Sequence, residues 1–155
     1  MFLKPLQKPE KKFMPKVVID ANVIVSSLFG GTPRKAFLKA LKTYDVYISP
    51  EIRQELSGLV DELEDKLDSL KIRRLRSIIM RLASYAKEAT PSKKVDLSRD
   101  KKDNAYLNLC LAVRANFLLT GDKDLLEIPV RELKSFGLNR LNIVSSKTFL
   151  SSEPD

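Results

Sequence analysis

The strongest constraint on the fold is a series of short, continuous apolar runs that alternate with stretches of helical spacing. Four such runs are KVVID (16–20), DVYIS (45–49), NFLLT (116–120) and LNIVS (141–145). Mostly apolar runs of this length are typical of strands that are covered on both faces. Strands that alternate with helices predict a parallel sheet. We therefore expect an α/β protein with three layers, α/β/α, and a parallel sheet of about five strands.

Helices are expected between these strands. Thr32-Pro33 and Ser49-Pro50 each resemble a capping residue followed by proline at the first helical position. Apolar residues recur at helical spacing over residues 67–86, and arginines occupy much of the other side of that helix. Another helix is predicted over residues 103–115, and a short helical turn around Phe149. The third strand is placed within residues 88–92.

The chain of 155 residues is expected to form one domain over residues 16–150. Residues 1–15 are rich in proline and lysine, which predicts a flexible basic tail, and Met14 is an alternative start. Residues 151–155 are expected to form a short C-terminal tail. No apolar run approaches the roughly 20 residues that span a bilayer, and no signal peptide is recognisable. These features predict a cytoplasmic protein that does not enter a membrane.

The absence of histidine excludes several kinds of chemistry. The sequence has no histidine and one cysteine, so Ser-His-Asp triads, Cys-His nucleophiles and zinc sites with histidine ligands are all ruled out. Cys110 lies in an apolar helical stretch and is expected to pack as a small hydrophobic residue. A formal net charge of +8 favours polyanionic partners such as nucleic acid. Catalysis would have to use carboxylates, lysine, serine or tyrosine.

Five acidic residues are expected at the carboxyl ends of the strands. Asp20 closes the first strand, Glu55 lies one turn into the helix after the second, and Asp103 opens the helix before the fourth. Asp122 and Asp124 follow the fourth strand in LTGDKD (119–124). Parallel strands bring their carboxyl ends to one edge of the sheet, where ligands bind. The five carboxylates are therefore predicted to converge on that edge.

Convergence of carboxylates indicates a cation. Two carboxylates about 4 Å apart repel by roughly 4 kcal/mol at an effective dielectric constant of about 20. Taken singly, each acid has a simpler explanation, because Asp and Asn terminate strands, cap helices and form turns. Taken together, and without histidine or a thiolate pair, they predict an all-oxygen site for Mg²⁺ or Mn²⁺.

Four stretches resemble the PIN-domain nucleases, small RNA-cleaving domains of which many are the toxin of a toxin–antitoxin pair. The stretches are VVIDANVIVSSLFGG (17–31), ISPEIRQEL (48–56), RDKKDNAYLNLCLAVRANFLLTGDKDLL (99–126) and, more weakly, NIVSSKTFL (142–150). The resemblance implies a five-stranded parallel sheet and a Mg²⁺- or Mn²⁺-dependent endoribonuclease that acts on single-stranded RNA. It also implies an antitoxin protein as a partner, and a homodimer is a further expectation.

The same resemblance implies a role for each acid. Asp20 would be the first metal-binding acid with Asn22 as its companion, and Glu55 the second, with Glu51 as the alternative one helical turn earlier. The remaining assignments are Asp103 as the third acid, Asp122 as the fourth, Asp124 as an additional carboxylate and Thr120 as a polar support. Asp100 has no fixed role in the resemblance and is expected only to help cap the helix. The predicted catalytic set is Asp20, Glu55, Asp103 and Asp122, and the predicted metal ligands are Asp20, Asp103, Asp122 and Asp124.

Two alternatives and one binding surface complete the expectations. A phosphatase with an aspartate nucleophile would need a second aspartate two residues after Asp20, where this chain has Asn22. A non-catalytic RNA- or partner-binding domain of the same fold remains the main alternative. Exposed basic side chains on the 67–86 helix would contact RNA, and the candidates are Arg73, Arg74 and Arg76.

Overall fold

The computed structural model describes residues 14–152, which form a five-stranded sheet flanked by helices. All neighbouring strands are parallel, and their order across the sheet is β3-β2-β1-β4-β5. The predicted α/β class and the parallel sheet are therefore confirmed. The strands are β1 Lys16–Ile19, β2 Asp45–Ile48, β3 Lys87–Glu88, β4 Phe117–Leu119 and β5 Asn142–Val144.

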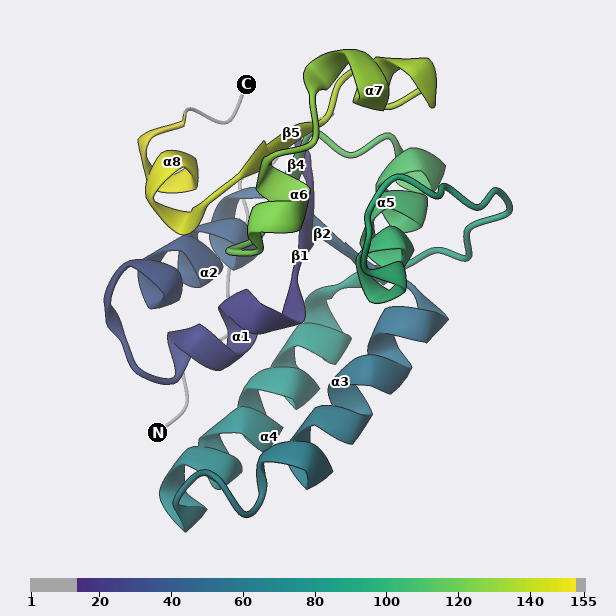
Figure 1. Ribbon diagram of the computed structural model, residues 1–155. Helices are drawn as coiled ribbons and strands as arrows, with labels where there is room; N and C mark the ends of the chain where they lie inside the picture. The colour runs from purple at the N-terminus through teal and green to yellow at the C-terminus, as the bar shows by residue number, and fades with distance from the viewer. Residues whose placement is uncertain (1–13, 153–155) are drawn as a thin grey trace.

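Helices cover both faces of this sheet. Figure 1 shows α1, α2 and α8 on one side and α5 on the other, while α3 and α4 run side by side and extend away from the sheet. Helix α5 packs against β1, β2 and β4. The helices are α1 Ala21–Ser27, α2 Gly31–Thr43, α3 Pro50–Leu63, α4 Ser69–Tyr85, α5 Lys101–Val113, α6 Lys123–Leu126, α7 Val130–Ser135 and α8 Ser146–Ser151.

The central strands carry apolar residues at consecutive positions because both of their faces are covered. Val18 pairs with Leu118 and Ile19 with Leu119 in the parallel register of β1 and β4. Val18, Leu118 and Leu119 are each at most 1% exposed. A strand buried on one face only would instead alternate between apolar and polar residues. The apolar runs in the sequence thus have the cause that was inferred for them.

The sheet ladder continues to the residues that form the site. The backbone N–H of Asp20 donates to the carbonyl of Leu119 at 2.9 Å, and the N–H of Thr120 donates to the carbonyl of Val144 at 3.0 Å. Both residues are buried. Inter-strand hydrogen bonds therefore position the backbone at the carboxyl edge, and this fixes the Cα atoms from which the Asp20 and Thr120 side chains extend.

The third strand differs from the prediction. The expected strand lay within residues 88–92, whereas β3 is Lys87–Glu88 and pairs with Tyr47 and Ile48 of β2. Both β3 residues are exposed at the edge of the sheet. An exposed strand of two residues has no apolar run, so sequence patterning could not locate it.

Two helix starts also differ from the prediction. Helix α1 follows β1 directly and was not predicted, because Asp20 and Asn22 were interpreted as the end of a strand. Helix α2 begins at Gly31 after Gly30, whose φ is 81°, so Thr32 lies inside the helix and does not cap it. A positive φ favours glycine, and Gly30 is the residue that precedes the first helical residue. The helix therefore begins directly after Gly30, before the predicted cap at Thr32.

The other helices begin close to the expected residues. Ser49 caps α3 by accepting a hydrogen bond from the N–H of Ile52 at 3.2 Å, as predicted. Asp68 caps α4 and Asp100 caps α5 through their side chains. The short helices α6 and α7 were not predicted, since four and six residues give too little periodicity to recognise.

The chain ends were expected to be tails. Residues 1–13 and 153–155 lie outside the described part of the chain, so the flexible basic tail and most of the C-terminal tail remain predictions. Pro15 is buried and its carbonyl accepts a hydrogen bond from the N–H of Asp45 at 2.9 Å. At the other end, α8 includes Ser151. Within residues 14–152, none of the helices has the length and apolarity that crossing a bilayer requires.

Candidate metal centre

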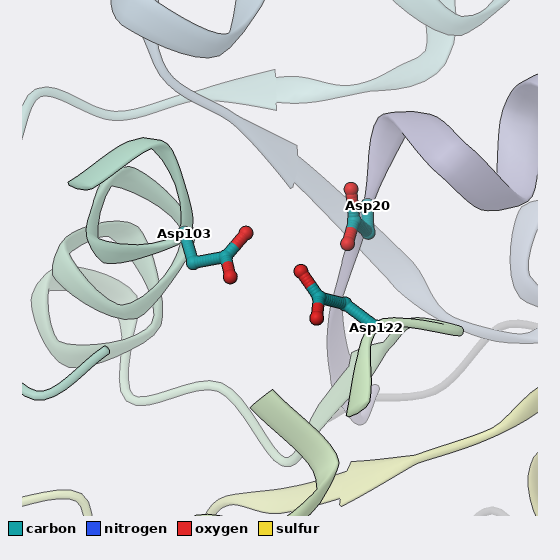
Figure 2. A group of neighbouring side chains, drawn as sticks. All are labelled: Asp20, Asp103 and Asp122. Atoms are coloured by element: carbon teal, nitrogen blue, oxygen red, sulfur yellow. The ribbon is translucent and has the colours of Figure 1, made fainter. Parts of the chain in front are cut away.

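Three of the five predicted acids meet at the carboxyl edge of the sheet. Asp20 follows β1, Asp103 lies in the first turn of α5, and Asp122 follows β4 (Figure 2). One carboxylate oxygen of each lies within 4.8 Å of the corresponding oxygens of the other two. Asp20 and Asp103 are buried and Asp122 is half-buried. We call these three residues the acidic triad.

Thr120 connects two members of the acidic triad. Its hydroxyl donates to Oδ2 of Asp20 at 2.6 Å and accepts from the backbone N–H of Asp122 at 3.0 Å. The side chain is fully buried, so this hydroxyl does not exchange partners with solvent. Thr120 therefore fixes the Asp20 carboxylate relative to the turn that carries Asp122.

Asn22 connects α1 to the same turn. Its side-chain oxygen accepts from the N–H of Gly121 at 3.3 Å, and its backbone N–H donates to Oδ1 of Asp20 at 3.3 Å. Oδ1 of Asp122 in turn accepts from the N–H of Asp124 at 2.9 Å. The turn after β4 is thus held by Asn22 of α1 and by a hydrogen bond within the turn itself.

Asp103 is supported by a residue that sequence reasoning missed. The hydroxyl of Ser98 donates to Oδ2 of Asp103 at 3.2 Å. Ser98 lies in the segment that precedes α5, where Asn104 accepts hydrogen bonds from the N–H groups of Leu97 and Ser98 at 3.1 and 2.9 Å. Asn108, one turn later, accepts from the N–H of Val95. The sequence offered one signal for this contact: Asn104 and Asn108 are spaced i, i+4 on the buried side of a helix, and buried amides need hydrogen-bond partners. Those partners are in the segment that carries Ser98.

Glu55 lies next to the acidic triad and is held by Tyr106. The Tyr106 hydroxyl donates a short hydrogen bond to Oε1 of Glu55 and accepts from the N–H of Ala21 at 3.1 Å. Tyr106 was also missed, although it lies three residues after Asp103 and therefore on the same side of α5. Glu51, the alternative, is exposed in the first turn of α3.

The remaining predicted residues lie outside the acidic triad. Asp124 is paired with Arg99, whose Nη2 is 3.1 Å from its Oδ1. Arg73, Arg74 and Arg76 are exposed on α4.

Burial and mutual repulsion raise the pKa values of the clustered acids. The pKa of Asp103 is raised to about 7, first by burial and then by the neighbouring Asp122 carboxyl. The pKa of Asp20 is raised by burial and, to a smaller extent, by Asp122, while hydrogen bonds from Thr120 and Asn22 oppose the increase. Burial also raises the pKa of Glu55, against the hydrogen bond from Tyr106. The charged forms of these groups are thus disfavoured without a cation.

The donor set fits a hard divalent cation. None of the ion pairs found within residues 14–152 includes Asp20, Asp103 or Asp122. The hydrogen bonds that they accept come from hydroxyl and backbone N–H groups, which carry no full charge. Oxygen ligands that leave room for water are what Mg²⁺ and Mn²⁺ prefer.

Comparison with known proteins identifies the family. The family model described as "PIN domain" matches residues 16–124, which is more than half of the chain. The chain belongs to the PIN domain family. No curated protein matches this PIN domain. A solved structure of VapBC2 from Rickettsia felis, bound to a DNA fragment from its promoter, contains a chain of the same fold. The TM-score is 0.54 at 15% identity, and the match covers 84% of this chain and 98% of that one.

The family match includes every acid discussed above. The matched residues 16–124 span β1 to β4 and end at Asp124, so the acidic triad lies entirely within them. Strand β5 and helix α8 follow the matched segment; β5 pairs with β4 at the edge of the sheet, and α8 packs against β5 and α2.

The raised pKa of Asp103 predicts a pH dependence of stability. Because the folded pKa of about 7 lies above the ordinary value of 3.8, the metal-free folded protein binds more protons than the unfolded chain between these values. The free energy of unfolding should therefore fall as the pH rises from about 4 to 7, by roughly 1–4 kcal/mol. Asp103→Asn should reduce this dependence, which urea unfolding in EDTA at several pH values would measure.

The matched control is Asp61→Asn, because Asp61 is exposed on α3 and lies outside the acidic triad. This variant should keep the pH dependence of the unmodified protein. Identical pH dependence in the Asp103→Asn variant would contradict the proposed origin of the effect.

Proposed function

We propose that this PIN domain is a metal-dependent endoribonuclease that hydrolyses phosphodiester bonds of single-stranded RNA in the cytoplasm, as a toxin-type protein. PIN domains are in general nucleases, which sets the class of reaction. The observation that carries the proposal is the acidic triad, whose oxygens lie within 4.8 Å of one another at the ligand-binding edge of a parallel sheet. The net charge of +8 supports a polyanionic substrate.

Asp20, Asp103 and Asp122 would hold Mg²⁺ or Mn²⁺, and Asp124 would complete the site through water. A bound ion would supply a water of lowered pKa and neutralise charge on the phosphodiester. Asp124 is assigned the indirect role because its carboxylate is paired with Arg99. Releasing Asp124 from this exposed ion pair would cost little, since such pairs contribute about 0–1 kcal/mol.

The neighbouring residues would position the reacting groups. Thr120 and Asn22 hold the Asp20 carboxylate and the turn of Asp122 in place. Glu55 is proposed as the second catalytic acid of the site, and its raised pKa suits a group that accepts a proton. Tyr106 would orient Glu55 through the short hydrogen bond between them.

The first test removes charge from the acidic triad. Asp20→Asn and Asp122→Asn should each reduce Mn²⁺-dependent cleavage of labelled single-stranded RNA by roughly 100-fold or more, because an amide is a poorer ligand for a hard cation. Both variants should fold, and their metal-free stability should equal or exceed that of the unmodified protein because repulsion is relieved. Asp61→Asn is the control of equal charge change. Full cleavage by both triad variants would refute the assignment.

The second test separates Asp124 from Asp122. If Asp124 acts through water, Asp124→Asn should weaken metal binding by roughly 10–100-fold, and excess Mn²⁺ should restore much of the cleavage. Asp122→Asn should not be restored in this way. Cleavage would be titrated against Mn²⁺ for both variants, and equal loss without restoration would mean that both acids bind the metal directly.

The third test concerns the exposed arginines of α4. Reversing Arg73, Arg74 and Arg76 to glutamate should weaken RNA binding and reduce its salt dependence, since each lost phosphate contact lowers the slope of log K against log salt by about 0.7 for single strands. Dissociation constants at two or more salt concentrations measure both effects.

The control for this test reverses three other exposed basic residues, Arg131 and Lys134 on α7 and Arg140 in the segment that follows it. Both triple variants change the net charge equally. If the two affect RNA binding to the same extent, the effect reflects net charge alone and α4 has no special role.

The alternative is a domain that binds RNA or a protein partner without turnover, and cleavage that is absent at all Mn²⁺ concentrations would favour it. An antitoxin protein is proposed as a partner, supported by the shared fold with a chain of VapBC2 from Rickettsia felis. A homodimer is a further proposal. An aspartate-nucleophile phosphatase is disfavoured because Asn22, at the position of its second aspartate, binds the Gly121 N–H.

A further inference from the structure

An open pocket lies beside the acidic triad, on the side of α1, α2 and α8. Its volume is about 260 Å³. Two of its residues are close in sequence to triad members: Asn22 lies two residues after Asp20, and Gly121 directly precedes Asp122. Asn22 and Gly121 are hydrogen-bonded to each other at 3.3 Å. Asp103 comes from α5, on the opposite face of the sheet (Figure 1). The pocket is lined by Asn22, Val23, Ser26, Pro33, Gly121 and Ser146.

Gly121 forms an open part of the pocket wall that the fold itself does not require. Its φ is not in the left-handed region that favours glycine. A Cβ atom added there would meet only Oδ1 of Asn22, at the ordinary contact distance of 3.9 Å. Neither the turn nor the packing of the described chain therefore demands glycine. A missing side chain that borders a pocket leaves room for a ligand to approach the backbone closely.

The pocket also presents polar groups without partners in the described chain. Because Oδ1 of Asn22 accepts from the Gly121 N–H, the amide orientation is defined and its NH₂ group remains as a donor. The hydroxyls of Ser26 and Ser146 make no hydrogen bond within residues 14–152. Each hydroxyl can both donate and accept. These groups offer hydrogen bonds to a ligand.

We infer that this pocket binds the ribose and base of a nucleotide adjacent to the scissile phosphate. The inference rests on the proposed function, since a cation held by the acidic triad next to the pocket would bind that phosphate. The lining carries no charged side chain, so it suits the neutral part of a nucleotide rather than a second phosphate. The half-buried Pro33 supplies apolar surface for a ring, and the serine hydroxyls and the Asn22 amide supply partners for ribose hydroxyls.

Two substitutions of Gly121 test the pocket by partly filling it. Gly121→Ala and Gly121→Val should weaken the binding of a fluorescein-labelled single-stranded oligoribonucleotide, the valine variant on the order of 10-fold and the alanine variant less. Fluorescence anisotropy in Ca²⁺, a hard cation that oxygen ligands also bind, measures this binding, and gel electrophoresis of the recovered RNA checks that it is intact. Mn²⁺ is expected to raise the Tm of the unmodified protein, and both variants should keep this increase because the triad carboxylates are unchanged.

The matched control is Gly58→Ala on α3. Gly58 is exposed, and no atom lies within 4 Å of an added Cβ. This variant should bind the oligoribonucleotide and respond to Mn²⁺ as the unmodified protein does. If Gly121→Val loses the Mn²⁺ response, Gly121→Ala decides the test, since its single methyl group fits without contact closer than 3.9 Å.

The outcomes separate the pocket from the nuclease activity. Unchanged RNA affinity in both Gly121 variants overturns the pocket, and cleavage by the unmodified protein would then leave the proposed function intact. Weaker binding by both variants supports the pocket even if the unmodified protein cleaves no RNA, in which case only the nuclease proposal fails. Absence of RNA binding by the unmodified protein overturns the pocket proposal as well.

Discussion

Mutual repulsion among three carboxylates is the interaction that the rest of this structure has to accommodate. Asp20 and Asp122 are carried by two central strands, whose ladder extends to Asp20 and Thr120 through backbone hydrogen bonds. Neutral donors then orient the side chains without cancelling their charge. An arrangement that holds like charges close together without an internal counter-ion stores unfavourable energy that a divalent cation would relieve.

Helix α5 organises the other half of the site. Asp103 and Tyr106 lie one turn apart, so one helix positions both a triad carboxylate and the hydroxyl that holds Glu55. Asn104 and Asn108 accept hydrogen bonds from the segment before the helix. These bonds place the Ser98 hydroxyl within hydrogen-bonding distance of Asp103. The apolar residues of α5 pack on the sheet at the same time. The same helix therefore contributes to the hydrophobic core and positions Asp103 and Tyr106 at the site.

The sequence predicted the parallel sheet and the convergence of Asp20, Asp103 and Asp122, because strand polarity and acids at strand ends are local features. It did not predict the roles of Ser98 and Tyr106, since a neutral hydroxyl carries no signal until the fold brings a carboxylate to it. Strand β3 was misplaced because two exposed edge residues show no apolar pattern. Asp124 was predicted as an additional carboxylate after β4; it forms an ion pair with Arg99, and its role at the metal stays a prediction. The individual catalytic roles remain predictions.

The pairing of β1 with β4 has a consequence for how the site arises during synthesis. Asp20 is made before its partners Asp103, Thr120 and Asp122, which follow it by 83, 100 and 102 residues in the sequence. Until β4 is available to pair with β1, the nascent chain holds only isolated, solvated acids. The acidic triad, and any chemistry that depends on it, therefore arises only once the chain has been made as far as Asp122.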